Sequence, residues 1–143
     1  MGANERRKHI LLVDDEAEFV FSAAIALRIA GYAVSVAASG GEALEKVGAL
    51  ARSGNAVDLL VTDIQMDGMS GHELIGAART RWPTLPVIAI TGQLDNDPGG
   101  GLAVGGCAGH ILKPFDPREF LDRIADVLTP GARRAERKQG GRR

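Results

Sequence analysis

The sequence predicts an α/β fold in which a parallel sheet carries helices on both of its faces. Short runs of β-branched and other apolar residues alternate along the chain with helical segments of about a dozen residues. This alternation is typical of units in which a helix connects two parallel strands. Charged or hydroxyl side chains follow several of the strand-like runs, at the end where such sheets place their functional groups.

The first half of the chain predicts three strands and two helices. Gly31 is expected to end the first helix, because glycine readily adopts the left-handed backbone needed there. Ser39 and Glu42 have the spacing of a capping box that opens the second helix. The strands are expected at His9–Val13, 32–37 and 58–62, and the helices at 16–30 and 40–52.

The second half repeats these signals. Ser70 and Glu73 form another capping box. Asp116 and Glu119, with Pro117 at the first helical position, open a C-terminal helix. The remaining elements expected are a helix that ends before Pro83 and strands at 86–91 and 108–112.

Segment 92–107 predicts a weak fourth helix. It contains Pro98 and several glycines, including five between 99 and 106. Glycine is less favourable than alanine by about 1 kcal/mol at each helical position. Any helix here is therefore expected to be short or frayed, and a plain loop is the alternative.

Length and charge indicate one folded domain with two flexible ends. The 143 residues suit a single domain. Residues 1–128 carry a net charge of −6, whereas 129–143 carry +5 and no aromatic residue. We expect a disordered N-terminus over 1–7, a folded domain over 8–128 and a basic flexible tail over 129–143. The tail is too short and too poor in aromatic residues to predict nucleic-acid binding.

The sequence also predicts the compartment. No apolar run approaches the roughly 20 residues that span a bilayer, and the N-terminus does not resemble a signal peptide. A single cysteine, Cys107, excludes an internal disulfide and fits a reducing environment. We therefore expect a cytoplasmic protein with no membrane association.

Five side chains are expected to meet at one edge of the sheet, each at or just past the end of a strand: Asp14, Asp15, Asp63, Thr91 and Lys113. Carboxylates gathered in one place repel each other unless a cation neutralises them. Because no His or Cys accompanies them, these oxygen ligands favour a hard divalent ion such as Mg²⁺. A carboxylate nucleophile, a metal, a lysine and a hydroxyl are the groups needed to transfer a phosphoryl group to an aspartate.

These motifs resemble the receiver domain of response regulators in two-component signalling. The resemblance rests on Asp14-Asp15, on DIQMDGMSG from Asp63, on Thr91-Gly92 and on Lys113-Pro114-Phe115, which stand in the family's order and spacing. It covers about residues 8–128 and implies a flavodoxin-like, doubly wound sheet of five parallel strands ordered 2-1-3-4-5. Too few residues follow 128 for an output domain, so we expect a stand-alone receiver.

The resemblance also implies roles. Asp63 would accept a phosphoryl group from a phosphohistidine on a sensor kinase or a phosphotransfer protein. Thr91 would hydrogen-bond that group and Lys113 would pair with it. Movement of Thr91 and of segment 92–107 would then remodel a surface that binds a downstream protein. Such a chain is a regulatory phosphoacceptor that assists its own phosphorylation and dephosphorylation, not an enzyme. The Mg²⁺ ligands would be Asp14, Asp15, Asp63 and the backbone carbonyl of Gln65.

Several positions modify this expectation. Asp67 replaces a proline common in the family, and His110 stands where an aromatic switch residue is usual. His110 could rotate as that aromatic does, or could be a tolerated substitute. Gln65 and Gln93 would flank the water that attacks the phosphoryl group and so tune its lifetime. The family usually has a cis peptide before the proline that follows its lysine, which here is Pro114.

The first helix is apolar around most of its circumference. Because a helix on a sheet buries only one stripe, Phe21, Ile25 and Ile29 are expected to form an exposed patch. The patch could dock a kinase helical bundle or form a homodimer seam, or a loop or the tail could cover it.

Two other functions compete with the receiver. A phosphatase of the haloacid dehalogenase type also uses an Asp nucleophile, but it needs Asp-x-Asp where this chain has Asp14-Asp15-Glu16. A receiver-like module could instead bind its partners without phosphorylation, which Asp67 and His110 keep open.

Overall fold

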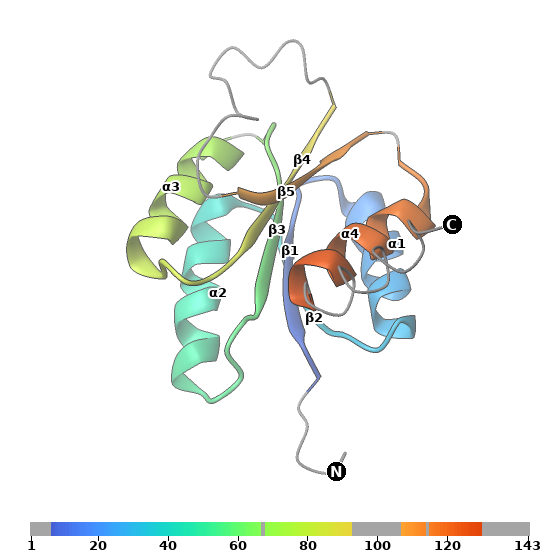
Figure 1. Ribbon diagram of the computed structural model, residues 1–143. Helices are drawn as coiled ribbons and strands as arrows, with labels where there is room; N and C mark the ends of the chain where they lie inside the picture. Colours follow the sequence, from blue (N-terminus) through green and yellow to red (C-terminus); the bar gives the residue numbers. More distant parts are fainter. Residues whose placement is uncertain (1–6, 67, 93–106, 114, 130–143) are drawn as a thin grey trace, which may run out of the picture.

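The computed structural model describes residues 7–66, 68–92, 107–113 and 115–129 as five strands and four helices around one sheet (Figure 1). All strand pairs are parallel, and the order is β2-β1-β3-β4-β5, as expected. The strands are β1 (His9–Val13), β2 (Ala33–Ala37), β3 (Leu59–Asp63), β4 (Val87–Thr91) and β5 (Cys107–Leu112). The helices are α1 (Ala17–Ile29), α2 (Gly40–Arg52), α3 (Gly71–Arg81) and α4 (Pro117–Leu128).

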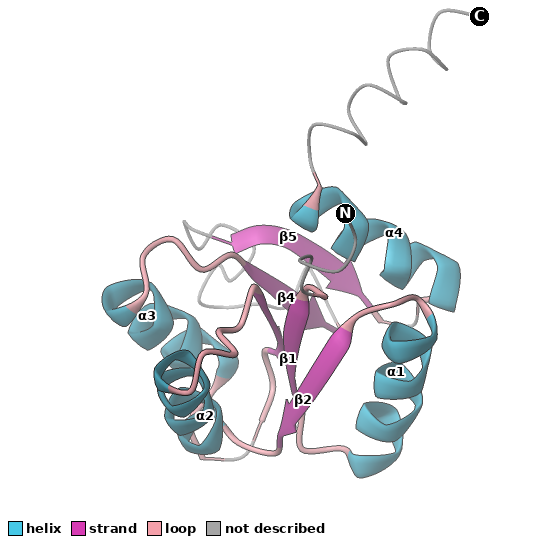
Figure 2. Cartoon of the chain, turned by 90° about the horizontal axis from the view of Figure 1, so that it is seen from below, coloured by secondary structure: helices cyan, strands magenta, loops and turns pink. Residues whose placement is uncertain are grey.

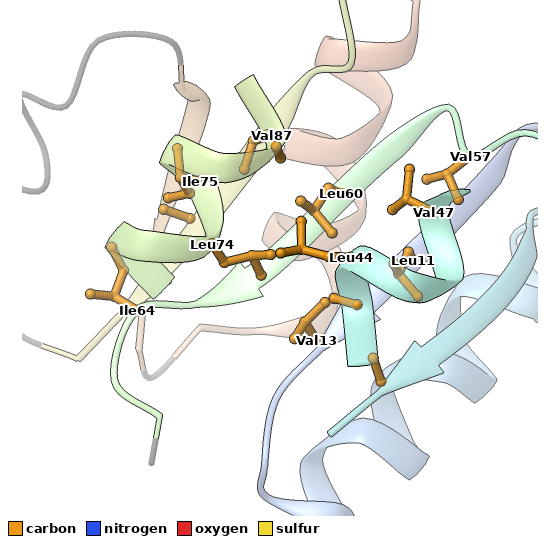
Figure 3. Packing of buried hydrophobic residues seen from close by; sticks show 14 residues of the cluster. Leu11, Val13, Leu44, Val47, Val57, Leu60, Ile64, Leu74, Ile75 and Val87 are labelled. Atoms are coloured by element: carbon orange, nitrogen blue, oxygen red, sulfur yellow. The ribbon is translucent and has the colours of Figure 1, made fainter. Parts of the chain in front are cut away.

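The helices form two layers that enclose the sheet. Figures 1 and 2 show α2 and α3 on one face and α1 and α4 on the other. Each face has its own core. Leu44 of α2 and Leu74 of α3 pack with Leu60 of β3 in one of them (Figure 3), and Leu27 of α1 packs with Phe120 of α4 in the other.

The three central strands are buried along their whole length. Every residue of β1, β3 and β4 is buried. A parallel sheet covered on both faces requires such continuous apolar runs, because neither set of alternating side chains meets water. The apolar runs of these strands are thus explained by their position in the middle of a covered sheet.

Two helix ends follow the expected chemistry closely. Gly31 has φ +106°, and the hydrogen bonds from Gly31 N–H to the Arg28 carbonyl and from Tyr32 N–H to the Leu27 carbonyl form a Schellman motif. At α3 the Ser70 hydroxyl accepts from Glu73 N–H while the Glu73 carboxylate accepts from Ser70 N–H, a complete capping box.

The box expected at α2 is altered. Ser39 accepts from Glu42 N–H as predicted, but Glu42 Oε1 accepts from Ala38 N–H, one residue before the cap, at 2.9 Å. The helix start is still satisfied, and the carboxylate ties the β2–α2 turn instead of the cap residue.

Some predictions lie outside the described residues. These are the weak fourth helix over 93–106, the flexible ends over 1–6 and 130–143, and the features assigned to Asp67, Gln93 and Pro114. The C-terminal helix expected from Asp116 is present and is the fourth described helix, α4. The Asp116 side chain accepts from Glu119 N–H at 2.8 Å. Within the described part of the chain, no helix is long and apolar enough to cross a membrane.

Candidate functional site

Three carboxylates meet at the carboxyl ends of two adjacent strands. Asp14 and Asp15 follow β1, and Asp63 is the last residue of the neighbouring β3. One carboxylate oxygen from each residue lies within 4.8 Å of the others. Asp14 and Asp63 are buried, whereas Asp15 is exposed. The parallel register brings these residues together, although nearly fifty positions separate them in the sequence.

Lys113 supplies the cation of this cluster. It directly follows β5, and its Nζ lies 3.5 Å from Asp63 Oδ2 and 3.6 Å from Asp14 Oδ2. Its backbone N–H donates to the Thr91 carbonyl at 2.8 Å, which joins the ends of β4 and β5. Lys113 therefore lies within reach of two carboxylates, and its flexible stem would let the ammonium pair with an anionic group attached to Asp63.

Burial disfavours the charged form of the Asp14 carboxyl. Burial raises its pKa, the Glu16 N–H that donates to Oδ1 at 2.9 Å opposes this, and the Asp63 charge adds to the rise. Its Oδ2 is buried and has no hydrogen bond within the described structure, apart from the longer approach of Lys113. A buried carboxylate oxygen without a donor is suited to a further cation.

Asp63 is positioned by the loop that follows it. Its Oδ1 accepts from Gln65 N–H at 3.3 Å, so the backbone of Gln65 lies at the site. Gly71, the first residue of α3, donates its N–H to the Ile64 carbonyl at 2.9 Å and closes the loop. The loop is thus anchored at both ends, next to the Asp63 carboxylate.

Thr91 and His110 share one face of the sheet. Thr91 ends β4, and His110 of β5 pairs with Ala89, two positions before Thr91. Because side chains alternate along a strand, both belong to the face covered by α2 and α3. His110 Nε2 is buried and finds no hydrogen-bond partner in the part of the chain that the structure describes.

The donor set fits a hard divalent cation. All three side chains offer carboxylate oxygen, and the group contains no imidazole or thiolate. Asp14 Oδ2 is the buried oxygen that such an ion would satisfy. Asp14, Asp15 and Asp63 would hold Mg²⁺, which leaves positions for waters and a phosphoryl oxygen.

Comparison with known proteins identifies this arrangement. The sequence model of the response regulator receiver domain matches residues 10–125. The chain belongs to this family. Receiver domains act in two-component systems, in which phosphorylation and Mg²⁺ binding are typical and histidine kinases or phosphotransfer proteins are the usual partners.

Relatives support this assignment at moderate identity. The receiver is 36% identical over 116 residues to the response regulator protein FleR of Pseudomonas aeruginosa, covering 81% of this chain and 24% of FleR. It is 30% identical over 122 residues to the response regulator SaeR of Staphylococcus aureus, covering 85% of this chain and 50% of SaeR. The chain thus spans between a quarter and half of the length of these curated relatives.

Solved structures agree with the fold. A CheY-like receiver domain protein from Methanospirillum hungatei is similar with a TM-score of 0.75 and 31% identity, covering 90% of this chain and 99% of that one. The response regulator TrrA from Thermotoga maritima, solved in complex with Mg²⁺-BeF, has a TM-score of 0.72 and 28% identity, covering 85% of this chain and 99% of TrrA.

The structure adds one site residue that the sequence did not indicate. Phe19 of α1 lies in the apolar first helix with no motif around it, yet the Lys113 ammonium lies over its ring, 5.2 Å from Nζ to the ring centroid. No spacing signal pairs an aromatic residue near one end of a chain with a lysine near the other. The contact follows from α1 and the β5–α4 connection lying over the same face of the sheet.

Proposed function

We propose that Asp63 of this receiver accepts a phosphoryl group from a phosphohistidine and thereby switches a protein-binding surface. The observation that carries the proposal is the pairing of Lys113 Nζ with Asp63 Oδ2 at 3.5 Å, beside two further carboxylates within 4.8 Å. A structural ion pair needs only one carboxylate. Three carboxylates around one lysine suit a site that receives both a divalent cation and an anion.

The transfer is a displacement at phosphorus. A carboxylate oxygen of Asp63 forms a bond to phosphorus while the bond from phosphorus to the donor imidazole nitrogen breaks, and that nitrogen leaves with the electron pair. Lys113 would pair with the phosphoryl oxygens, and the Thr91 hydroxyl would donate a hydrogen bond to them. Mg²⁺, held by the aspartates and the Gln65 carbonyl, supplies charge neutralisation for the phosphoryl oxygens when bound.

Intact-mass analysis tests this proposal directly. The protein is incubated with Mg²⁺ and acetyl phosphate, with Asp63→Asn alongside. We expect a single added phosphate that disappears in the variant and in EDTA. Asn at this position keeps the size of the side chain but is a poor nucleophile, so loss of the adduct reports the acceptor and not the fold.

A phosphorylation-independent binding module is the second candidate. His110 favours it, because it stands in place of the family's aromatic switch residue and its buried Nε2 has no hydrogen-bond partner among the described residues. Absence of an adduct, together with unchanged NMR spectra on adding Mg²⁺ and beryllofluoride, would support the module. Continuous release of phosphate from small phosphate esters would instead indicate a phosphatase.

We also propose that Thr91 and His110 form the switch. Their shared face and their offset of two positions support the idea that movement of Thr91 toward a phosphoryl group opens space for His110. Gln65 and Gln93 are proposed to tune dephosphorylation. The half-life of the phosphorylated protein should change in Gln65→Ala and Gln93→Ala, while the rate of phosphorylation stays within about twofold.

The exposed stripe of α1 is proposed as the docking surface for the phosphodonor. Phe21, Ile25 and Ile29 are 70%, 41% and 81% exposed. Phe21 also lines a groove of about 360 Å³ between α1 and β2, and Asp14 and Asp15 line the same groove. A helical bundle seated on this stripe would therefore lie next to the phosphorylation site.

Charge substitutions test the docking surface. Phe21→Glu and Ile25→Glu should slow transfer from a cognate kinase while phosphorylation by acetyl phosphate, which needs no docking, stays unchanged. Glu at the exposed Ala49 of α2 is the matched control. Equally slow transfer in the control would show that added negative charge, and not the stripe, slows transfer. Dissociation of a homodimer by the α1 variants would identify the stripe as a dimer interface instead of a docking surface.

The cytoplasmic location, the division into 1–7, 8–128 and 129–143, and the stand-alone arrangement stay predictions. So does the regulatory, non-enzymatic role, which the phosphate-release assay above examines. A downstream protein target would be identified by retention on the beryllofluoride-bound protein and not on the free protein.

A further inference from the structure

Within the described part of the chain, the Lys113 ammonium has three close neighbours of two kinds. Two are the carboxylates of Asp14 and Asp63. The third is the face of the Phe19 ring, whose centroid lies 5.2 Å from Nζ, within the range of a cation–π contact. The side chain is 28% exposed, so water and other charges compete for the ammonium.

The Phe19 ring is held by an aromatic stack that leads into the core. Phe19 meets Phe115 edge to face, with centroids 5.8 Å apart and an interplanar angle of 82°. Phe115 stacks on Phe120 at 5.2 Å and 17°, and Phe120 of α4 is 2% exposed. A ring fixed in this way presents its negative face at a defined place, as an offset or edge-to-face arrangement allows.

Competing carboxylates lie on the open side of the lysine. Lys113, Phe19 and Phe115 line a groove of about 650 Å³ together with Glu16 and Glu18, both of which are exposed. An ammonium released from the ring could swing along its flexible stem toward these glutamates. A contact on the side of Asp14 and Asp63 would therefore favour the position of the ammonium at the phosphorylation site over one near these glutamates.

We propose that Phe19 is a positioning residue for Lys113, keeping the ammonium at the acceptor carboxylate before and after phosphorylation. The inference rests on the proposed function, because it assigns a task to the lysine that pairs with the phosphoryl group. A lysine that is already ordered loses less rotamer freedom when the phosphoryl group arrives. Phe19 thus strengthens phosphoryl binding without touching it.

Substitutions at Phe19 separate the ring face from simple packing. Phe19→Tyr keeps the aromatic face, whereas Phe19→Leu keeps only an apolar side chain. We expect Phe19→Leu to weaken Mg²⁺-dependent beryllofluoride binding about two- to tenfold, the range of one cation–π contact, and Phe19→Tyr to retain it. Equal losses in both variants, or no loss in Phe19→Leu, would overturn the proposal.

A geometric measurement needs no phosphoryl chemistry. Protons above an aromatic face are shifted upfield by the ring current, so the Hε resonances of Lys113 should lie upfield in the wild type and move downfield in Phe19→Leu. An unshifted wild-type resonance would also overturn the proposal. If instead the resonance is shifted but the wild type neither binds beryllofluoride nor forms the adduct, the proposed function fails, and the phosphoryl-binding role of Phe19 fails with it.

Discussion

Gly71 packs directly against the backbone of Asp63. A Cβ on this glycine would overlap the Asp63 carbonyl oxygen, and it would also come within 2.5 Å of the Ile64 Cα. Neither atom belongs to a flexible side chain that could move away. The absence of a side chain at the start of α3 therefore sets how closely this helix approaches the end of β3.

Gly71→Ala should displace the end of β3 and the loop that carries Gln65. We expect a loss of about 1–3 kcal/mol in the free energy of unfolding, as for overpacking elsewhere, together with slower phosphorylation by acetyl phosphate. Urea unfolding and intact-mass time courses measure the two effects. Gly76→Ala in the same helix is the control. Its Cβ meets nothing within 4 Å, so it should stabilise the protein by about 0.5–1 kcal/mol. A Gly71→Ala variant that behaves like the control would show that the close approach is unimportant.

Asp14→Asn should stabilise the metal-free protein at about pH 7. Burial raises the pKa of Asp14 above 3.8, so the folded state binds this proton more tightly than the unfolded state does. The ionised carboxylate therefore lowers stability as the pH rises from 3.8 through the raised pKa, and the full penalty is present above that raised value. Removing the charge should add about 1–3 kcal/mol in EDTA, and the gain over the wild type should shrink as the pH falls to about 4. Urea unfolding at both pH values decides this, and a gain that grows toward acid would contradict it.

Mg²⁺ should reverse the order of the two proteins. An ion that binds only the folded state stabilises it by about 2.7 kcal/mol when its concentration is 100 times its dissociation constant. The wild type should gain this stabilisation, and Asp14→Asn, which lacks one ligand charge, should gain much less. Thermal unfolding across a Mg²⁺ titration measures both gains. If Mg²⁺ stabilised the variant equally, Asp14 would not be a ligand.

Local chemistry made most of the fold and the acidic cluster predictable. Burial of β1 and β3 follows from their unbroken apolar runs, and the parallel register places the residues after them side by side. The complete capping box at Ser70 needs only two side chains three positions apart. Features set by packing between distant elements were not predictable. The Glu42 carboxylate accepts from Ala38 N–H instead of from Ser39 N–H. Phe19 contacts Lys113 only because α1 and the β5–α4 connection lie over the same face of the sheet.

The exposed edge of the sheet shows another relation between distant elements. β2 is an edge strand, and its Val34 and Val36 carbonyls accept from Arg28 of α1 and Lys46 of α2. Ala33 N–H donates to the Lys8 carbonyl, and the Ala37 carbonyl accepts from Asp14 N–H, so both residues bond toward β1. Because the backbone groups of successive residues in a strand point in opposite directions, the carbonyls of Val34 and Val36 point to the free edge. Two cations from opposite helix layers thus occupy groups that a second strand would need.

Removing both cations should let the edge pair with another molecule. The double variant Arg28→Ala/Lys46→Ala leaves the Val34 and Val36 carbonyls open, and we expect concentration-dependent dimers or larger species in sedimentation or light scattering. Arg118→Ala/Arg123→Ala removes the same charge from exposed positions of α4 and should stay as the wild type. Both double variants shift the net charge from −1 to −3, which by itself opposes association. Equal association in both pairs would therefore indicate an effect of lost positive charge that is not specific to the β2 edge. Association confined to the edge variant, and abolished when Val36→Pro is added, would show that β2 itself is the pairing surface. Proline lacks the backbone N–H that a second strand would accept from at this position.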